Sequence, residues 1–264
     1  MSSKPIEKLV LSWKKNRIFF VSINRPEKKN CVNHETAKEL IKAFETFEAD
    51  KSADIAILTG QGGTFCAGYD LLEVAVNKFP KDEYAADFLE KYRFMGPSMM
   101  QLSKPLIAAI EGFAVAGGLE LALLADLRVA SETAQFGVLC RRFGVPLIDG
   151  GTIRLPAVLG LSRAMDLILT GRPIDAKLGF EWGLVNRLCL AGSALVEAEK
   201  LAEEILQNPQ RCLRADRLST YNSVFNSNGN LRDSFDFELQ NGIPVLNDAV
   251  KGAAKFIKKE HSKI

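Results

Sequence analysis

Histidine, paired cysteine and long apolar runs are scarce in this sequence, and each scarcity excludes a class of site or protein. Two histidines and five widely spaced cysteines without a Cys-x-x-Cys motif predict free thiols, a reducing compartment and no metal site. The most apolar stretch is interrupted by Glu111 and Glu120, which argues against a membrane-spanning helix. The opening MSSKPIEKL lacks the apolar core of a signal peptide. We therefore expect a soluble intracellular protein with no membrane partner.

An excess of charge of one sign is also missing. The 34 basic and 32 acidic side chains leave a formal net charge of +2, so the chain lacks the broad positive surface that nucleic-acid binding requires. The last three residues, Ser262, Lys263 and Ile264, differ from the peroxisomal Ser-Lys-Leu signal by one aliphatic side chain. We expect either a frayed polar tail or a peroxisomal signal there; without the signal, the cytosol and the mitochondrion are the expected compartments.

Short strands and amphipathic helices alternate along the chain. Two strands are expected within residues 9–23, a helix from His34, and a buried strand at 55–59 that is ended by glycines. Because strand and helix alternate, we predict an α/β architecture with ligand sites at the strand ends. Residues 74–100 mix charged and aromatic side chains and suggest a mobile cover more than a core element.

The composition changes after Gly192, where helix-forming residues begin to dominate. We predict a core domain at residues 1–192 and a helical C-terminal region at 193–264. A chain of 264 residues with 47% apolar side chains is large enough to bury a full core.

The most informative stretch is an apolar strand that breaks at Gly117 and Gly118 and continues into an apolar segment carrying Glu120. Glycines let the backbone approach a ligand closely and leave N–H groups free at a helix N-terminus, where the helix dipole favours negative charge. Such donors beside a carboxylate can hold an oxyanion and move a proton. The same local sequence equally suits a closely packed helix with Glu120 as a solvated acid in its first turn.

Six motifs, in order, resemble those of the crotonase, or enoyl-CoA hydratase/isomerase, superfamily. They are NRP at 24–26, FCAGYD at 65–70, GFAVAGGLEL at 112–121, AQFG at 134–137, GGTIRLP at 150–156, and LTGRPIDA with GLVN within 169–186. The resemblance covers roughly residues 8–190. It implies an α/β fold, a crotonase-like spiral of strand-strand-helix turns, with a C-terminal helical region that serves oligomerisation as a homotrimer or a dimer of trimers.

The resemblance also implies an acyl-CoA substrate, with coenzyme A as part of that substrate and no tightly bound cofactor. The thioester carbonyl is then expected between the backbone N–H groups of Tyr69 and Gly117. Each preorganised donor of this kind is worth about 3 kcal/mol when negative charge develops on the carbonyl oxygen. The implied CoA-binding positions are Ala67, Gly68, Leu71, Lys28 and Gly118. Lys28 and its neighbour Lys29 fit a phosphate contact and a solvated loop equally well.

One expected acid is missing. Hydratases of this superfamily use two glutamates; Glu120 matches the first, and the position of the second holds Cys140. A thiol with a pKa near 8.5 is mostly protonated at neutral pH and positions water poorly. Hydration by two glutamates is therefore in doubt, and we expect Cys140 to be a small buried apolar side chain rather than a nucleophile.

Asp149 offers a different acid, close to the position of an aspartate in dienoyl-CoA isomerases and dehalogenases of the superfamily. It lies between Ile148 and a glycine pair, so burial would raise its pKa and suit it to proton transfer or to nucleophilic attack. Alternatively, Asp149 caps the helix expected from Gly150. The neighbouring Arg141 and Arg142 could pair with either acid, bind a substrate carboxylate, or be solvated.

The leading hypothesis is an acyl-CoA-processing enzyme of the hydratase or double-bond isomerase type, with Glu120 and Asp149 as acid and base. Tyr69 and Gly117 would stabilise the thioester enolate. The alternatives are dehalogenase-like nucleophilic chemistry at Asp149, and a non-catalytic member of the superfamily that binds acyl-CoA or RNA.

Overall fold

The computed structural model describes residues 8–76, 83–226 and 230–246, and the chain divides into two units, Met1–Ala202 and Glu203–Ile264. The division falls after Ala202, later than the change in composition after Gly192. That the C-terminal region serves oligomerisation stays a prediction. The C-terminal tripeptide lies outside the described residues.

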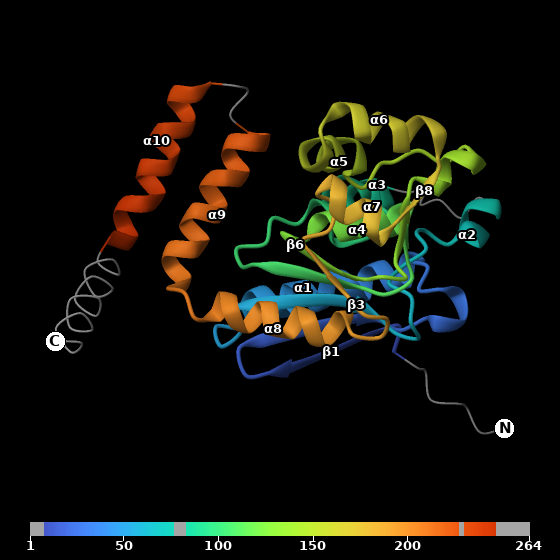
Figure 1. The fold of residues 1–264 in the computed structure, drawn as a ribbon, viewed down its shortest axis with the longest axis horizontal. Coiled ribbons are helices and arrows are strands. Elements are labelled where there is room, and N and C mark those ends of the chain that lie inside the picture. Colours follow the sequence, from blue (N-terminus) through green and yellow to red (C-terminus); the bar gives the residue numbers. More distant parts are fainter. Residues whose placement is uncertain (1–7, 77–82, 227–229, 247–264) are drawn as a thin grey trace. The chain divides into compact units, whose positions relative to one another are not determined.

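The first unit is built on a six-stranded sheet with the order β1-β2-β3-β4-β6-β9 (Figure 1). The pair β1 and β2 is antiparallel, and the other neighbours are parallel. Strands β2, β3 and β4 are almost wholly buried, as expected for the continuous apolar runs of a sheet covered on both faces. The strands are β1 Val10–Lys15, β2 Ile18–Ile23, β3 Ile55–Gly60, β4 Leu106–Ile110, β6 Leu127–Ser131 and β9 Arg187–Cys189.

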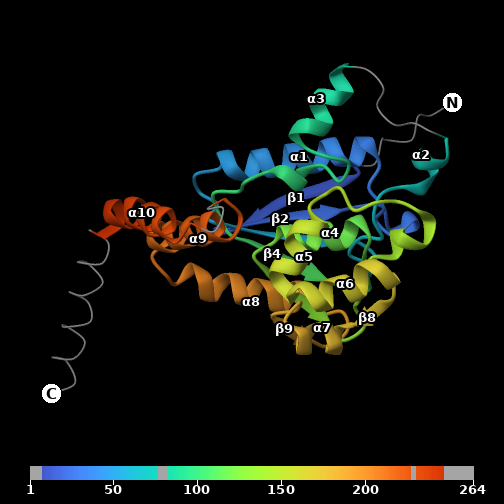
Figure 2. The same cartoon turned by 90° about the horizontal axis from the view of Figure 1, so that it is seen from above.

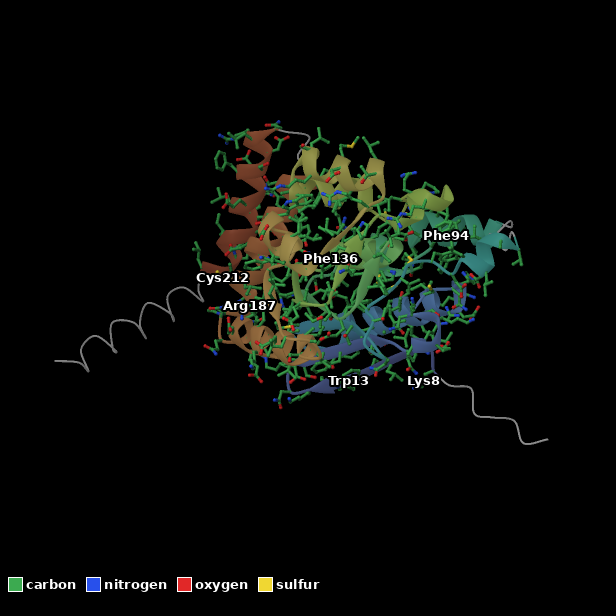
Figure 3. All side chains as sticks on the ribbon, turned by 45° about the vertical axis from the view of Figure 1, so that its right-hand side comes forward. Lys8, Trp13, Phe94, Phe136, Arg187 and Cys212 are labelled. Atoms are coloured by element: carbon green, nitrogen blue, oxygen red, sulfur yellow. The ribbon has the colours of Figure 1, made fainter. Side chains whose placement is uncertain are left out.

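A second sheet has three short strands in the order β5-β7-β8. They are β5 Phe113–Val115, β7 Gln135–Gly137 and β8 Pro173–Asp175. Strand β5 is parallel to β7, which is antiparallel to β8. Phe136 in β7 is fully buried (Figure 3) and holds this small sheet in the core. Because β5 pairs with β7, the segment that runs from β5 to the glycine pair begins at a fixed position.

Helices surround both sheets of the first unit. The last of them, α8, continues past Ala202 into the second unit. The helices are α1 His34–Ala49, α2 Leu71–Ala75, α3 Glu83–Lys91, α4 Gly117–Leu124, α5 Gly151–Leu159, α6 Leu161–Thr170, α7 Ala176–Trp182 and α8 Ala194–Leu206, with short 3-10 turns η1 Pro26–Lys28, η2 Pro97–Met99 and η3 Leu139–Phe143. Helix α1 begins where the Asn33 side chain accepts a hydrogen bond from the backbone N–H of Thr36, and it packs against β1 and β2 (Figure 2). All eight residues of α4 are buried, which explains its lack of a polar face.

In the second unit, α9 Gln210–Phe225 packs against α10 Leu231–Gly242, which is followed by η4 Ile243–Val245. The side chain of Asn230 caps α10 by accepting hydrogen bonds from the backbone N–H groups of Arg232 and Asp233.

The α/β prediction and the expected strands within 9–23 and at 55–59 are confirmed, as is the helix from His34. Residues 77–82 of the expected cover at 74–100 lie outside the described residues, and the expectation of a cover more than a core element was wrong for the end of that segment. Met95 and Ser98 are fully buried, at 0% and 1% exposure, and the backbone N–H of Met95 and the hydroxyl of Ser98 donate to the buried carboxylate of Asp149. Within the described residues, no helix combines the length and apolar character needed to cross a membrane.

Candidate active site

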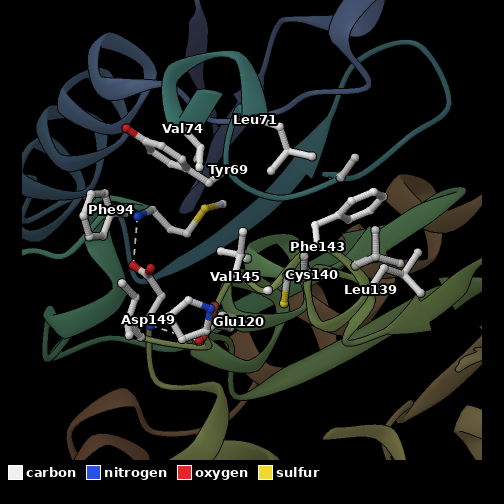
Figure 4. A pocket seen from close by; sticks show the side chains of 18 of the residues that line it. Tyr69, Leu71, Val74, Phe94, Glu120, Leu139, Cys140, Phe143, Val145 and Asp149 are labelled. Atoms are coloured by element: carbon white, nitrogen blue, oxygen red, sulfur yellow. Dashed lines mark hydrogen bonds between the residues drawn. The ribbon is translucent and has the colours of Figure 1, made fainter. Parts of the chain in front are cut away.

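An apolar cavity of about 560 Å³ lies against the N-terminal end of α4. Its few polar side chains include Glu120, Asp149 and Cys140 (Figure 4). A mostly apolar pocket with a few placed polar groups is typical of a small-molecule site. The lining consists of Lys29, Ala67, Tyr69, Leu71, Val74, Phe94, Met95, Phe113, Val115, Ala116, Gly117, Glu120, Leu139, Cys140, Phe143, Gly144, Val145, Pro146, Ile148 and Asp149.

The glycine pair brings the start of α4 close to the neighbouring chain. A Cβ atom on Gly118 would lie 2.0 Å from the carbonyl oxygen of Cys66, so only glycine fits there. Ala116, before the pair, has a φ of 53°, a strained conformation for a residue with a side chain. Its N–H is held by the carbonyl of Gly137 in β7. This strained turn directs the chain so that Gly117 lines the cavity.

Tyr69 lies beside this turn, on the loop that precedes α2. Gly68 has a φ of +104°, and a Cβ atom built on it would lie 3.1 Å from the backbone nitrogen of Gly117, so the two loops meet at this point. Asp70 fixes the loop, because its carboxylate caps α2 and forms a buried ion pair with Arg25 at 3.0 Å. The backbone N–H groups of Tyr69 and Gly117 have no hydrogen-bond partner among the described residues. Both are therefore available to a ligand in the cavity.

Glu120 lies in the first turn of α4 and is 3% exposed, which rules out the solvated acid that the local sequence allowed. Its Oε1 accepts hydrogen bonds from the backbone N–H groups of Asp149 at 2.9 Å and Gly151 at 2.8 Å. Burial and, to a lesser extent, the negative charge of Asp149 together raise the pKa of Glu120 from 4.5 to about 7, although the two backbone donors oppose this shift. A carboxyl group with this pKa can both accept and release a proton at neutral pH.

Asp149 is equally buried, at 3% exposure. Its Oδ1 accepts hydrogen bonds from the backbone N–H of Met95 at 2.8 Å and the hydroxyl of Ser98 at 2.7 Å. Burial raises the pKa of Asp149, although these two hydrogen bonds oppose the shift. The alternative of a helix cap was wrong, because the N-cap of α5 is Gly150 and no side chain caps it.

The two arginines beside Cys140 do not hold these acids. Arg141 donates to the carbonyl of Ile168 and Arg142 to that of Gly171, so both satisfy carbonyl groups at the C-terminal end of α6. Of the alternatives left open for them, pairing with Glu120 or Asp149 was wrong. Arg154 of α5 is the guanidinium whose charge acts on both acids.

Cys140 is buried, at 8% exposure, and lines the cavity. Burial raises the pKa of its thiol, and the charge of Glu120 raises it further. In Figure 4, Cys140 and Asp149 appear on opposite sides of Glu120. The thiol is therefore protonated at neutral pH and offers Glu120 no second carboxylate on that side.

The expected CoA-binding residues divide into two groups. Ala67 and Leu71 line the cavity, whereas Lys28, Gly68 and Gly118 are not among its lining residues. Lys28 is exposed on η1, and the next residue, Lys29, lines the cavity instead, with its ammonium 5.0 Å from the centre of the Phe113 ring. Roles of these residues in binding stay predictions.

Sequence reasoning missed the donors that hold Asp149 and the two guanidinium groups, of Arg93 and Arg154, whose charges act on it. Met95 and Ser98 flank a Gly-Pro pair. Such a pair indicates a turn, but it does not indicate that the turn binds Asp149. Arg154 belongs to the GGTIRLP motif, but the motif gave no indication of its role. No cluster of three or more metal-ligating side chains occurs among the described residues.

Comparison with known proteins agrees with the motifs. The enoyl-CoA hydratase/isomerase family model matches residues 14–263. A probable enoyl-CoA hydratase of Mycobacterium leprae is 34% identical over 92% of this chain and 92% of its own length. A probable mitochondrial enoyl-CoA hydratase of Arabidopsis thaliana is 35% identical over 94% of this chain and 82% of its own.

The fold is similar as well. The crystal structure of an enoyl-CoA hydratase from Mycobacterium tuberculosis superimposes with a TM-score of 0.86 and 37% sequence identity, covering 96% of this chain and 97% of the other. The match extends over both units of the chain. This chain belongs to the enoyl-CoA hydratase/isomerase family, of the crotonase superfamily.

Proposed function

We propose that this protein processes acyl-CoA thioesters, as an enoyl-CoA hydratase or double-bond isomerase. One observation carries the proposal: two backbone N–H groups that have no partner among the described residues meet two buried carboxyl groups with raised pKa values in one apolar cavity. Donors for an oxyanion and groups for proton transfer are what chemistry next to a thioester carbonyl requires.

The backbone N–H groups of Tyr69 and Gly117 would hold the thioester oxygen. Removing a proton next to the carbonyl, or adding a nucleophile across a conjugated double bond, places negative charge on this oxygen as an enolate forms. Fixed donors that point to the developing charge lower the barrier more than they stabilise the substrate. The helix dipole of α4 adds to this effect at Gly117.

Glu120 and Asp149 would exchange the protons. Two buried carboxyl groups that repel each other are expected to carry one proton between them near neutral pH. The ionised carboxylate removes a proton from the acyl chain or from water, and the protonated carboxyl delivers one to another carbon. An isomerase returns the proton to the same molecule, so it needs no bound water and no second glutamate at position 140.

Three substrates test the proposal directly: crotonyl-CoA for hydration, a 3-enoyl-CoA for a one-bond shift, and a dienoyl-CoA for a longer shift. Turnover of at least one of them is expected. A folded protein that binds CoA thioesters but converts none of the three would contradict the proposal and favour a non-catalytic binding role. A covalent acyl adduct on Asp149 in intact-protein mass spectrometry would instead favour nucleophilic chemistry.

The remaining expectations follow from the family resemblance. Lys29, Ala67 and Leu71 at the cavity would contact the CoA part of the substrate, with coenzyme A entering and leaving as part of that substrate. Assembly as a homotrimer or a dimer of trimers would be read from the mass of the protein in solution.

A further inference from the structure

Ser98 holds one of the two acids and itself lies outside the cavity lining. Its hydroxyl donates to Oδ1 of Asp149 over 2.7 Å, across 51 residues of chain. The backbone N–H of Met95 donates to the same oxygen. With both donors on Oδ1, the carboxylate cannot rotate freely, and Oδ2 is the oxygen that neither donor engages.

We propose that Ser98 is a positioning residue, which sets the orientation and ionisation of Asp149 for proton exchange with the substrate. The inference rests on the proposed function only in assigning that exchange to Asp149. Ser98 does not line the cavity, so it acts through the carboxylate and not on the substrate.

The structure also fixes Ser98 itself. Gly96 precedes η2 with a φ of +87°, and Pro97 is the first residue of that turn. Arg154 donates to the backbone carbonyl of Ser98 at 2.7 Å and to that of Asp149 at 3.3 Å. One guanidinium therefore ties together the backbones of the donor and the acceptor, and the hydroxyl is held within reach of the carboxylate.

The chemistry of a hydroxyl suits this place. A cation in direct contact would keep Asp149 permanently ionised, because an opposite charge strongly favours the carboxylate. A neutral hydroxyl stabilises the carboxylate less and can also accept a hydrogen bond when the acid is protonated. Asp149 therefore keeps a partner in both protonation states.

Other charged groups act on Asp149 from several elements. Arg93, which follows α3, and Arg154, in α5, favour the ionised form, and Glu120 in α4 and the Tyr69 hydroxyl also interact with its charge. The contribution of Ser98 must be separated from these by changing the hydroxyl alone.

Ser98→Ala removes the donor, Ser98→Thr keeps it, and Ser131→Ala serves as the control. Ser131 is equally buried, and its hydroxyl shares a 2.9 Å hydrogen bond with Thr133 in a region outside the cavity. The first measurement needs no substrate: the infrared carbonyl band of protonated Asp149, identified by its loss in Asp149→Asn, is followed against pH in each full-length variant. The second is the pH dependence of kcat/KM.

We expect Ser98→Ala to shift the titration of Asp149 upward by about one pH unit, as the loss of one hydrogen bond to a charged group implies. The limb of the kcat/KM profile that belongs to Asp149 should move with it, and Ser98→Thr should restore both. An unshifted infrared titration in Ser98→Ala, or an equal shift in Ser131→Ala, would overturn the proposal. If Ser98→Ala does not fold, the near-isosteric Ser98→Cys, a weaker donor, must give a smaller shift in the same direction.

The proposed function and the proposed role of Ser98 can be refuted independently of each other. If the wild-type protein converts no enoyl-CoA, the proposed function fails, while the infrared titration still decides the role of Ser98. If Ser98→Ala shifts the infrared titration but leaves the kcat/KM profile in place, Ser98 controls the carboxyl group and the assignment of proton exchange to Asp149 is wrong.

Discussion

The backbone N–H of Asp149 donates a 2.9 Å hydrogen bond to Oε1 of Glu120, so the main chain of one acid holds the side chain of the other. The link fixes the separation between the two residues, while burial and mutual repulsion raise the pKa of Glu120. An acid pair of this kind responds to substitution as a unit.

Replacing Glu120 by glutamine should lower kcat by about 10²-fold or more, because general acid–base catalysis typically contributes 10²–10⁴-fold. The amide oxygen can still accept the two backbone hydrogen bonds, so the variant should fold and substrate affinity should change little. Steady-state kinetics and thermal unfolding check this. Glu111→Gln is the matched control, since Glu111 also accepts a backbone N–H, that of Ala194 at 2.9 Å, outside the cavity lining. Equal rates for both variants would remove Glu120 from the mechanism.

Asp149→Asn should also lower kcat, by a factor on the order of 10², with the fold intact. The side-chain oxygen of asparagine can still accept hydrogen bonds from Met95 and Ser98, but the amide cannot take up or release a proton as an acid does. The control is Asp175→Asn, because Asp175 does cap a helix, accepting from the backbone N–H of Leu178 at 2.8 Å. An unchanged rate in Asp149→Asn would leave Glu120 as the only acid.

The buried charge of Glu120 should destabilise the protein at high pH. Because the pKa of Glu120 rises from 4.5 to about 7 on folding, the folded state binds more protons between these values, and stability falls as pH rises through that window. Relative to wild type, Glu120→Gln should therefore gain unfolding free energy on the order of 3 kcal/mol between pH 4.5 and about pH 8. Urea unfolding at several pH values measures this. A difference independent of pH would show that Glu120 is ionised in the folded state throughout.

The sequence predicts those parts of the site that are formed by neighbouring residues in the chain. It does not predict contacts between residues that are distant in the chain. The turn from β5 through the glycine pair into α4 was predicted because strand, glycine pair and helix follow one another in the chain, whereas its role in holding an oxyanion came from the family resemblance and stays a prediction. The partners of Asp149 come from Met95 and Ser98, more than fifty residues away, and no periodicity links them. Sequence proximity suggested Arg141 and Arg142, whereas Arg154 acts on both acids and Arg93 acts on Asp149. Local sequence therefore predicts elements better than long-range polar contacts.

A glutamate at position 140 should favour hydration. Cys140→Glu adds a carboxyl group to the cavity wall close to Glu120, where it can bind and activate a water molecule. We expect the rate of crotonyl-CoA hydration to rise relative to the rate of double-bond shift in a 3-enoyl-CoA. Cys140→Ser, which removes the thiol without adding an acid, is the control. If the ratio of the two rates is the same in both variants, position 140 does not determine the reaction.

The ion pair of Arg25 with Asp70 should matter for stability. Both side chains are about nine-tenths buried, and removing one partner of a buried pair typically costs about 3–5 kcal/mol. Arg25→Met should therefore lower the unfolding free energy by that amount in urea titration. Arg17→Met breaks the pair of Arg17 with Asp54, in which the arginine is 48% exposed, and should cost less than about 1 kcal/mol. Similar losses would show that the buried pair is not special.

The acids of this cavity are held largely by main-chain N–H groups, those of Met95, Asp149 and Gly151. A backbone donor is present whatever side chain the position carries. Under the proposed function, we therefore expect that Val74 and Val145 of the apolar wall can be exchanged to suit longer, shorter or branched acyl groups while Glu120 and Asp149 stay in place. Selectivity could then be engineered without rebuilding the groups proposed to react.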